Sequence, residues 1–350
     1  MKTETNARLQ YLDIAKGIGI LMVIIGHCPS IPVMLNQLIF SVHMPLFFIL
    51  SGYTFKLKYS EQPWKYIAKT AKALLIPYGI SCLIIIAVQV FKSIIYEGDT
   101  AYELLKWINA SWYGSGGKYP EFFVNHGIPM TYIGALWFLL AMFFAKSFLV
   151  LIMRSRTPFL WVMICLFIGY VSSQKLFWFP FSIQAGLCSV LFVYIGYLIR
   201  EKDLFSWKAV HWTLKILMLG AWIYCIVFCG RFWLVGNTFS DGFLDIIGSV
   251  CGTFVIVYIS QGLEKVRPLR FLLSGTGRLS LGIMCAHLIV LDCLKIGRRA
   301  GVLVDTFHVS YRTAEIIVVT VASLGLAVIL YFVPFINKKL YPVKFMGAKR

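Results

Sequence analysis

Long apolar runs dominate this sequence and restrict its fold more than any other feature. A helix that crosses a bilayer needs about 20 mostly apolar residues, and we identify ten such stretches among the 350 residues. Runs such as ILMVII and CLIIIAV lack the polar–apolar alternation of barrel strands. Helices are expected, because they satisfy their own backbone hydrogen bonds where no water is present. The expected spans are 11–30, 35–55, 73–96, 132–152, 159–177, 183–200, 212–230, 242–260, 280–297 and 312–336.

Composition supports the same fold class, an all-α polytopic integral membrane helical bundle. The chain is 59% hydrophobic and only 14% charged, whereas soluble domains are about 25% charged. This excludes a soluble enzyme, a disordered chain and a disulfide-stapled secreted scaffold. We expect a single domain over residues 1–350 with the lipid bilayer as a partner.

The distribution of Lys and Arg predicts how the chain is oriented, because cytoplasmic segments of membrane proteins carry an excess of these residues. With the N-terminus inside, 23 of them fall in inner segments and 8 in outer segments. Both termini are then cytoplasmic, and 97–131 is a long outer loop; the membrane that we expect is a bacterial inner membrane. The net charge of +18 arises from this bias and not from one basic face, so no nucleic acid partner is expected.

Ionisable residues inside apolar spans are costly and are therefore candidate functional residues. In the first span, Asp13 and Lys16 lie three residues apart and can pair on one helix face. Lys16 and His27 lie eleven residues apart, which places them on one face about 16 Å apart along the axis. A snorkelling lysine and a hydrogen-bonded interfacial histidine are the alternative interpretations. The glycines of this span permit close approach of another helix.

Polar and aromatic candidates also occur in later spans. His43 lies in the second span, next to Pro45, which frees a backbone carbonyl and can kink the helix. The short connection between the first two spans places His43 at a depth comparable to that of His27. Trp137 lies in the outer third of the fourth span, where an aromatic-belt anchor is the alternative. His287 lies near the middle of the ninth span, where a core histidine is the alternative.

The absence of known catalytic motifs limits the reactions that this chain could catalyse. No G-x-S-x-G, H-E-x-x-H, Walker A or G-x-G-x-x-G motif occurs, so hydrolase, protease and ATPase interpretations have no support. Two histidines without an intramembrane carboxylate or a third close ligand do not favour a metal, so no metal is expected. An imidazole has an unperturbed pKa of about 6.5 and can accept a proton near neutrality. A base without its own nucleophile favours direct transfer from a bound donor to a substrate hydroxyl.

Four segments resemble the membrane-bound acyltransferase 3 family: YLDIAKGIGILMVIIGH, FSVHMPLFFILSGYTF, LWFLLAMF and LSLGIMCAHLIVL. They follow the family's order over most of the chain and are similar to the fucose 4-O-acetylase-like branch of carbohydrate O-acetyltransferases. The family's pattern of a basic residue, ten positions and a histidine is matched by Lys16 and His27. The resemblance implies transfer of an acetyl group from cytoplasmic acetyl-CoA to a hydroxyl of a cell-surface or lipid-linked glycan.

The resemblance also implies roles for the residues of the first two spans. His27 is expected to be the general base, and His43 to assist by a hydrogen bond to the donor carbonyl or to the acceptor. Lys16 is expected to hold the donor phosphate or to stabilise the inner end of the donor channel, with Asp13 orienting it. The separation of about 16 Å between Lys16 and His27 matches the reach of an extended pantetheine arm.

The remaining two candidates are expected to shape the substrate pocket. Trp137 would stack on the sugar or shape the tunnel, and His287 would form a wall or relay protons. A transporter or flippase of a sugar or glycan lipid is the competing interpretation. A structural subunit of a polysaccharide export complex is a third.

Overall fold

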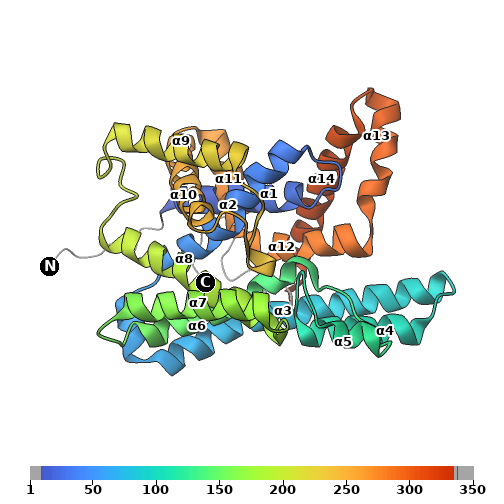
Figure 1. Cartoon of the computed structure of the whole chain (residues 1–350). Coiled ribbons are helices and arrows are strands. Elements are labelled where there is room, and N and C mark those ends of the chain that lie inside the picture. The colour runs from blue at the N-terminus through green and yellow to red at the C-terminus, as the bar shows by residue number, and fades with distance from the viewer. Residues whose placement is uncertain (1–8, 335–336, 338–350) are drawn as a thin grey trace.

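The computed structural model describes residues 9–334 and residue 337, and these residues are almost entirely helical (Figure 1). Two short strands, β1 (Phe232–Trp233) and β2 (Thr238–Phe239), pair in an antiparallel hairpin. The helices are α1 (Gln10–Gly26), α2 (Val33–Tyr53), α3 (Pro63–Ile95), α4 (Thr100–Tyr113), α5 (Glu121–Asn125), α6 (Trp137–Ile152), α7 (Pro158–Lys175), α8 (Ile183–Glu201), α9 (Trp212–Phe228), α10 (Phe243–Leu263), α11 (Arg267–Arg278), α12 (Ser280–Leu288), α13 (Ala300–Phe307) and α14 (Tyr311–Phe332).

The expected polytopic helical membrane fold is confirmed. Within the described part of the chain, seven helical segments are long and apolar enough to cross a membrane, namely those of α2, α3, α6, α7, α8, α10 and α14. The pair α11 and α12 makes an eighth if it is counted as one bent span. The two other expected spans correspond to α1 and α9, which have 17 residues each, at the short end of the range of about 17–25 residues. The exact count of ten spans stays a prediction.

Two expected spans differ in outline from the helices observed. The third begins ten residues earlier than expected, because Pro63 occupies the first turn of a continuous helix of 33 residues. At about 1.5 Å per residue, α3 is about 50 Å long and must tilt or extend beyond the hydrocarbon. The ninth, expected at 280–297, is α-helical only to Leu288 and continues as a π-helical turn over Ile289–Cys293. It is preceded by α11, and the two helices are bent by 67°.

The segment 97–131 is not simply the loop that was expected, because it contains α4 and α5. The Asp99 side chain caps α4 by accepting a hydrogen bond of 2.9 Å from the backbone N–H of Tyr102. Gly114 ends the helix with a φ of 67°, a conformation that favours glycine. Burial raises the pKa of Tyr113 to about 12, so its hydroxyl stays protonated and donates to the carbonyl of Trp178. These contacts make the segment an ordered part of the fold.

Helix α1 lies at the centre of the bundle and packs against α2, α10, α11, α12 and α14. Its crossing with α11 brings two backbones together, as the glycines of the first span predict. A Cβ added at Gly17 would lie 2.2 Å from the carbonyl oxygen of Leu273. A Cβ added at Gly277 would lie 1.8 Å from the carbonyl oxygen of Asp13. This contact fixes α1, which carries Asp13, Lys16 and His27, against the helix that leads into α12.

Candidate active site

A cavity of about 410 Å³ lies beside the C-terminal end of α1. This volume is within the range of about 300–1,000 Å³ that small-molecule sites occupy. Its walls come from the end of α1, one face of α2, the start of α6, the β1 strand and the segment that follows α12. The lining residues include His27, Phe40, His43, Trp107, Tyr132, Trp137, Phe232 and Trp233. The structure thus brings His27, His43 and Trp137 together from three separate helical segments.

His27 is the residue at which α1 ends, and its ring is held by its own helix. The Nδ1 atom lies 2.8 Å from the carbonyl oxygen of Val23, one turn earlier. A carbonyl oxygen only accepts hydrogen bonds, so Nδ1 must carry the proton. In the neutral ring Nε2 then carries the lone pair, which is the atom that a general base uses.

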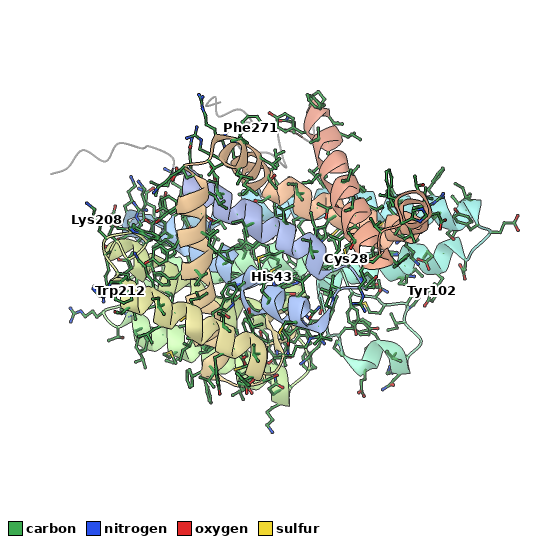
Figure 2. The ribbon with its side chains drawn as sticks, turned by 90° about the horizontal axis from the view of Figure 1, so that it is seen from above. Cys28, His43, Tyr102, Lys208, Trp212 and Phe271 are labelled. Carbon is green, nitrogen blue, oxygen red and sulfur yellow. The ribbon has the colours of Figure 1, made fainter. Side chains whose placement is uncertain are left out.

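His43 adopts the same arrangement on α2 and is only 3% exposed. Its Nδ1 lies 2.7 Å from the carbonyl oxygen of Ile39, and the ring of Phe40 meets it edge-on with centroids 4.8 Å apart. Figure 2 shows His43 near the middle of the molecule. The carbonyl of Ser41, which Pro45 leaves without its helical N–H partner, accepts a hydrogen bond of 2.7 Å from Ser249 Oγ of α10. The expected effect of Pro45 on the backbone next to His43 is therefore observed.

His287 lies behind His27 and does not line the cavity. The two ring centroids are 5.5 Å apart with an interplanar angle of 66°, and His287 is completely buried. Its ring lies next to the backbone of Ile283 and Met284, about one turn earlier, but no hydrogen bond of regular geometry is formed with the residues that the structure describes. His287 therefore lies next to His27 but outside the cavity.

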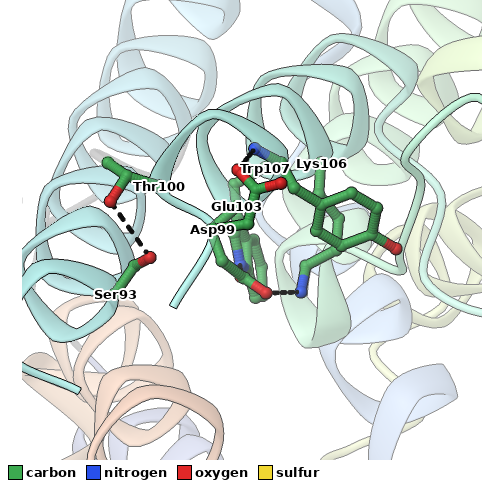
Figure 3. A network of polar contacts seen from close by, with 7 residues as sticks. Ser93, Asp99, Thr100, Glu103, Lys106 and Trp107 are labelled. Carbon is green, nitrogen blue, oxygen red and sulfur yellow. Dashed lines mark hydrogen bonds and ion pairs between the residues drawn. The ribbon is translucent and has the colours of Figure 1, made fainter. Parts of the chain in front are cut away.

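The cavity wall is mainly aromatic, and its aromatic side chains are themselves held in place. Trp137 is 4% exposed and starts α6, where a Cβ at Gly116 would lie 2.4 Å from its ring. The absence of a side chain at Gly116 therefore makes room for Trp137. Trp107 donates from Nε1 to a carboxylate oxygen of Glu103 at 3.3 Å, within the polar network of α4 (Figure 3). Sequence reasoning missed Trp107 and Trp233, because they lie outside the expected spans.

The two charged candidates of α1 lie toward its other end and do not line the cavity. Asp13 is 2% exposed, and its Oδ2 lies 3.6 Å from Nε of Arg278 on α11. Lys16 is half-buried. Nζ of Lys146 on α6 lies 5.8 Å from the centre of the Tyr66 ring on α3, and Lys16 of α1 and Lys69 of α3 are near enough to interact with it electrostatically, so three helices contribute cations to one region. Sequence reasoning missed this convergence, although Lys146 interrupts an apolar run and was an available signal.

The described residues contain no group of three or more His, Cys, Asp or Glu side chains arranged to hold a metal ion. What the fold and the site define is a membrane protein whose helices enclose an aromatic cavity beside two oriented imidazoles. The model of an acyltransferase domain matches residues 9–332, so the chain belongs to the acyltransferase 3 family and is a membrane acyltransferase. Comparisons with curated proteins and with solved structures returned no match.

Proposed function

We propose that this acyltransferase moves an acetyl group from acetyl-CoA to a hydroxyl of a cell-surface or lipid-linked glycan, as in the fucose 4-O-acetylase-like branch. One observation carries the proposal: the His27 ring lines an aromatic cavity with its proton held on Nδ1. An imidazole in this state accepts a proton at Nε2 and needs no nucleophile of its own. Aromatic side chains are suited to stacking on a sugar ring.

In the reaction, Nε2 of His27 accepts the proton of the acceptor hydroxyl while the hydroxyl oxygen attacks the thioester carbonyl. The carbon–sulfur bond breaks, the acetyl group forms an ester, and the departing CoA thiolate takes the proton from His27. Because Nδ1 of His43 is also held by a carbonyl, the neutral ring of His43 offers Nε2 as an acceptor. This favours a contact of His43 with the acceptor hydroxyl over one with the donor carbonyl. His287, whose ring centroid lies 5.5 Å from that of His27, serves as a wall behind the proposed base.

The donor end of the proposal rests on the cations near Lys16. Phosphate groups of acetyl-CoA are attracted to the joint potential of Lys16, Lys69 and Lys146. Asp13 pairs with Arg278 and so holds this part of α1 against α11. The orientation predicted from the Lys and Arg distribution places these cations and both termini on the cytoplasmic side, where acetyl-CoA is present. The cavity then lies toward the outer side of a bacterial inner membrane.

The test is an acetyl-transfer assay with purified protein, labelled acetyl-CoA and a panel of glycan acceptors. His27→Ala should lower transfer by about 10²–10⁴-fold, the usual contribution of a general base, while the protein still inserts. His126→Ala is the matched control, because Nδ1 of His126 bonds to the carbonyl of Phe122 in the same way but the ring is exposed and outside the cavity.

Near-normal transfer by His27→Ala would remove His27 from the base role. Failure of the wild-type protein to bind or use any acyl-CoA, together with movement of a glycan lipid across vesicles, would favour a transporter or flippase instead.

A further inference from the structure

Helix α14 carries a buried carboxylate that the proposed reaction does not use. Glu315 lies about one turn from the start of this apolar helix and is only 5% exposed. A carboxylate inside a membrane helix is costly unless strong hydrogen bonds compensate for the lost water. The contacts of Glu315 therefore indicate what it does.

Both hydrogen bonds found for Glu315 come from one residue of the loop that follows α1. The backbone N–H of Ser30 donates to Oε2 of Glu315 over 3.1 Å, and the hydroxyl of Ser30 donates to the same oxygen. Hydrogen bonds to an ionised group are roughly twice as strong as those between neutral groups. The two residues are 285 positions apart in sequence, so this contact fastens the end of α1 to the last helix of the bundle.

The position of Ser30 makes the contact relevant to His27. Ser30 lies three residues after His27, in a short loop that has no regular secondary structure of its own and joins α1 to α2. Cys28, next to His27, is 2% exposed, and Figure 2 places it at the end of α1 that faces the C-terminal helices. The backbone N–H groups of His27 and Cys28 donate to carbonyls of their own helix. Glu315 adds the contact that joins the loop after them to another helix.

The same helix also positions the neighbour of His27. Helix α14 packs closely against α12, which carries His287, and against the turn at Ile296–Arg299. A Cβ added at Gly297 would lie 3.3 Å from Oε1 of Glu315, so this turn closes over the carboxylate. Helix α14 thus contacts both the loop after His27, through Glu315, and the helix of His287, whose ring centroid lies 5.5 Å from that of His27.

We infer that Glu315 is a positioning residue that holds His27 at the cavity through Ser30. The inference rests on the proposed role of His27 as base. A displacement of about 1 Å in a reacting group can lower a rate by about 100-fold, so loss of the carboxylate should act on the chemical step. It should spare donor binding, because the cations near Lys16 lie at the other end of α1.

The experiment compares Glu315→Ala, Glu315→Gln, Ser30→Ala and the double variant of Ser30→Ala with Glu315→Ala. Glu315→Ala should lower kcat about 100-fold with the KM for acetyl-CoA unchanged. Glu315→Gln should lose only about tenfold, because its amide oxygen can take the place of Oε2 and accept both bonds, which are weaker without the negative charge. The double variant should lose no more than Glu315→Ala, because both changes remove the same contact. Glu201→Gln, at an exposed position at the end of α8, is the matched control for replacing a glutamate by glutamine, and its kcat should equal that of the wild type.

A second measurement does not depend on activity. Cys28 and Cys285 are both buried free cysteines, and only Cys28 lies in the loop that Glu315 holds. Alkylation by N-ethylmaleimide, followed by mass spectrometry of the peptides, should become about fivefold or more faster at Cys28 in Glu315→Ala and stay unchanged at Cys285.

The inference is overturned if kcat of Glu315→Ala stays within about twofold of the wild-type value, whatever the alkylation shows. It is equally overturned if Cys28 stays protected in that variant. A wild-type protein that transfers no acetyl group would refute the proposed function, and the alkylation of Cys28 would then decide alone whether Glu315 holds the loop.

Discussion

The crossing of α1 and α11 allows a sharp test, because Gly277→Ala places a methyl group directly between two backbones. The new carbon would lie 1.8 Å from the carbonyl oxygen of Asp13, about 1.6 Å short of the ordinary contact of 3.4 Å. No flexible side chain can yield at this point, so the two helices must separate. Overpacking costs about 1–3 kcal/mol where neighbours can adjust, and we expect the upper end of that range here.

Gly220→Ala in α9 is the matched control, since nothing lies within 4 Å of the Cβ that it adds. Alanine is favoured over glycine inside a helix by about 1 kcal/mol, so this variant should be as stable as the wild type or more stable. Thermal unfolding of both variants in one detergent should show a melting temperature about 5 °C or more lower for Gly277→Ala.

The variant with the lower melting temperature should also use acetyl-CoA less well. Separating α1 from α11 lengthens the ion pair between Asp13 and Arg278, which is already 3.6 Å, and shifts the part of α1 that carries Lys16. The KM for acetyl-CoA should therefore rise in Gly277→Ala and not in Gly220→Ala. Equal melting temperatures for the two variants would refute the close contact and would remove α11 from the elements that position α1.

Two further predictions separate the donor end of the site from the acceptor end. Lys16→Ala should raise the KM for acetyl-CoA about tenfold, whereas Lys16→Arg should keep most donor use because it keeps the charge; equal losses in the two variants would argue against a charge role. Trp137→Ala should raise the KM for the glycan about 2- to 10-fold and leave the KM for acetyl-CoA unchanged, with a smaller loss for Trp137→Phe. A parallel rise in both constants would mean that Trp137 supports the fold and not the acceptor.

Hydropathy predicted most of the helices because it is a local property that each segment carries by itself. The helices α7, α8 and α10 begin within a residue of the expected spans. The same local reasoning failed where tertiary contacts determine the direction or the ends of a helix. No apolar pattern marks the bend of 67° between α11 and α12. The expected outer loop folded into helices because a cap at Asp99 and a left-handed Gly114 define α4.

In the candidate site, too, local features of the sequence were predicted and tertiary contacts were not. The short connection between α1 and α2 indicated that His27 and His43 lie at comparable depth, and both residues line the cavity. Sequence reasoning did not reveal that His287 lies behind His27, because the depth and direction of that residue depend on the bend before α12. It also passed over Glu315, since only the folded chain shows that this carboxylate meets Ser30.

Three polar residues outside the cavity share one role, which is to form hydrogen bonds with backbone groups that lack a regular helical partner near the imidazoles. Ser249 donates to the carbonyl that Pro45 leaves without its helical partner. Lys92 of α3 donates over 2.7 Å to the carbonyl of Cys293, in the π-helical turn after α12. Glu315 accepts the N–H of Ser30 in the loop after α1.

A backbone polar group without a partner in an apolar surrounding costs several kcal/mol, so these contacts stabilise the irregular segments. Each partner comes from a different helix, so the three contacts tie α10, α3 and α14 to the segments that carry His43, His287 and His27. The irregular backbone segments orient the three histidine side chains, and the hydrogen bonds from other helices stabilise these segments. Substitutions at the partners should therefore lower the rate of the chemical step before they lower binding of the donor.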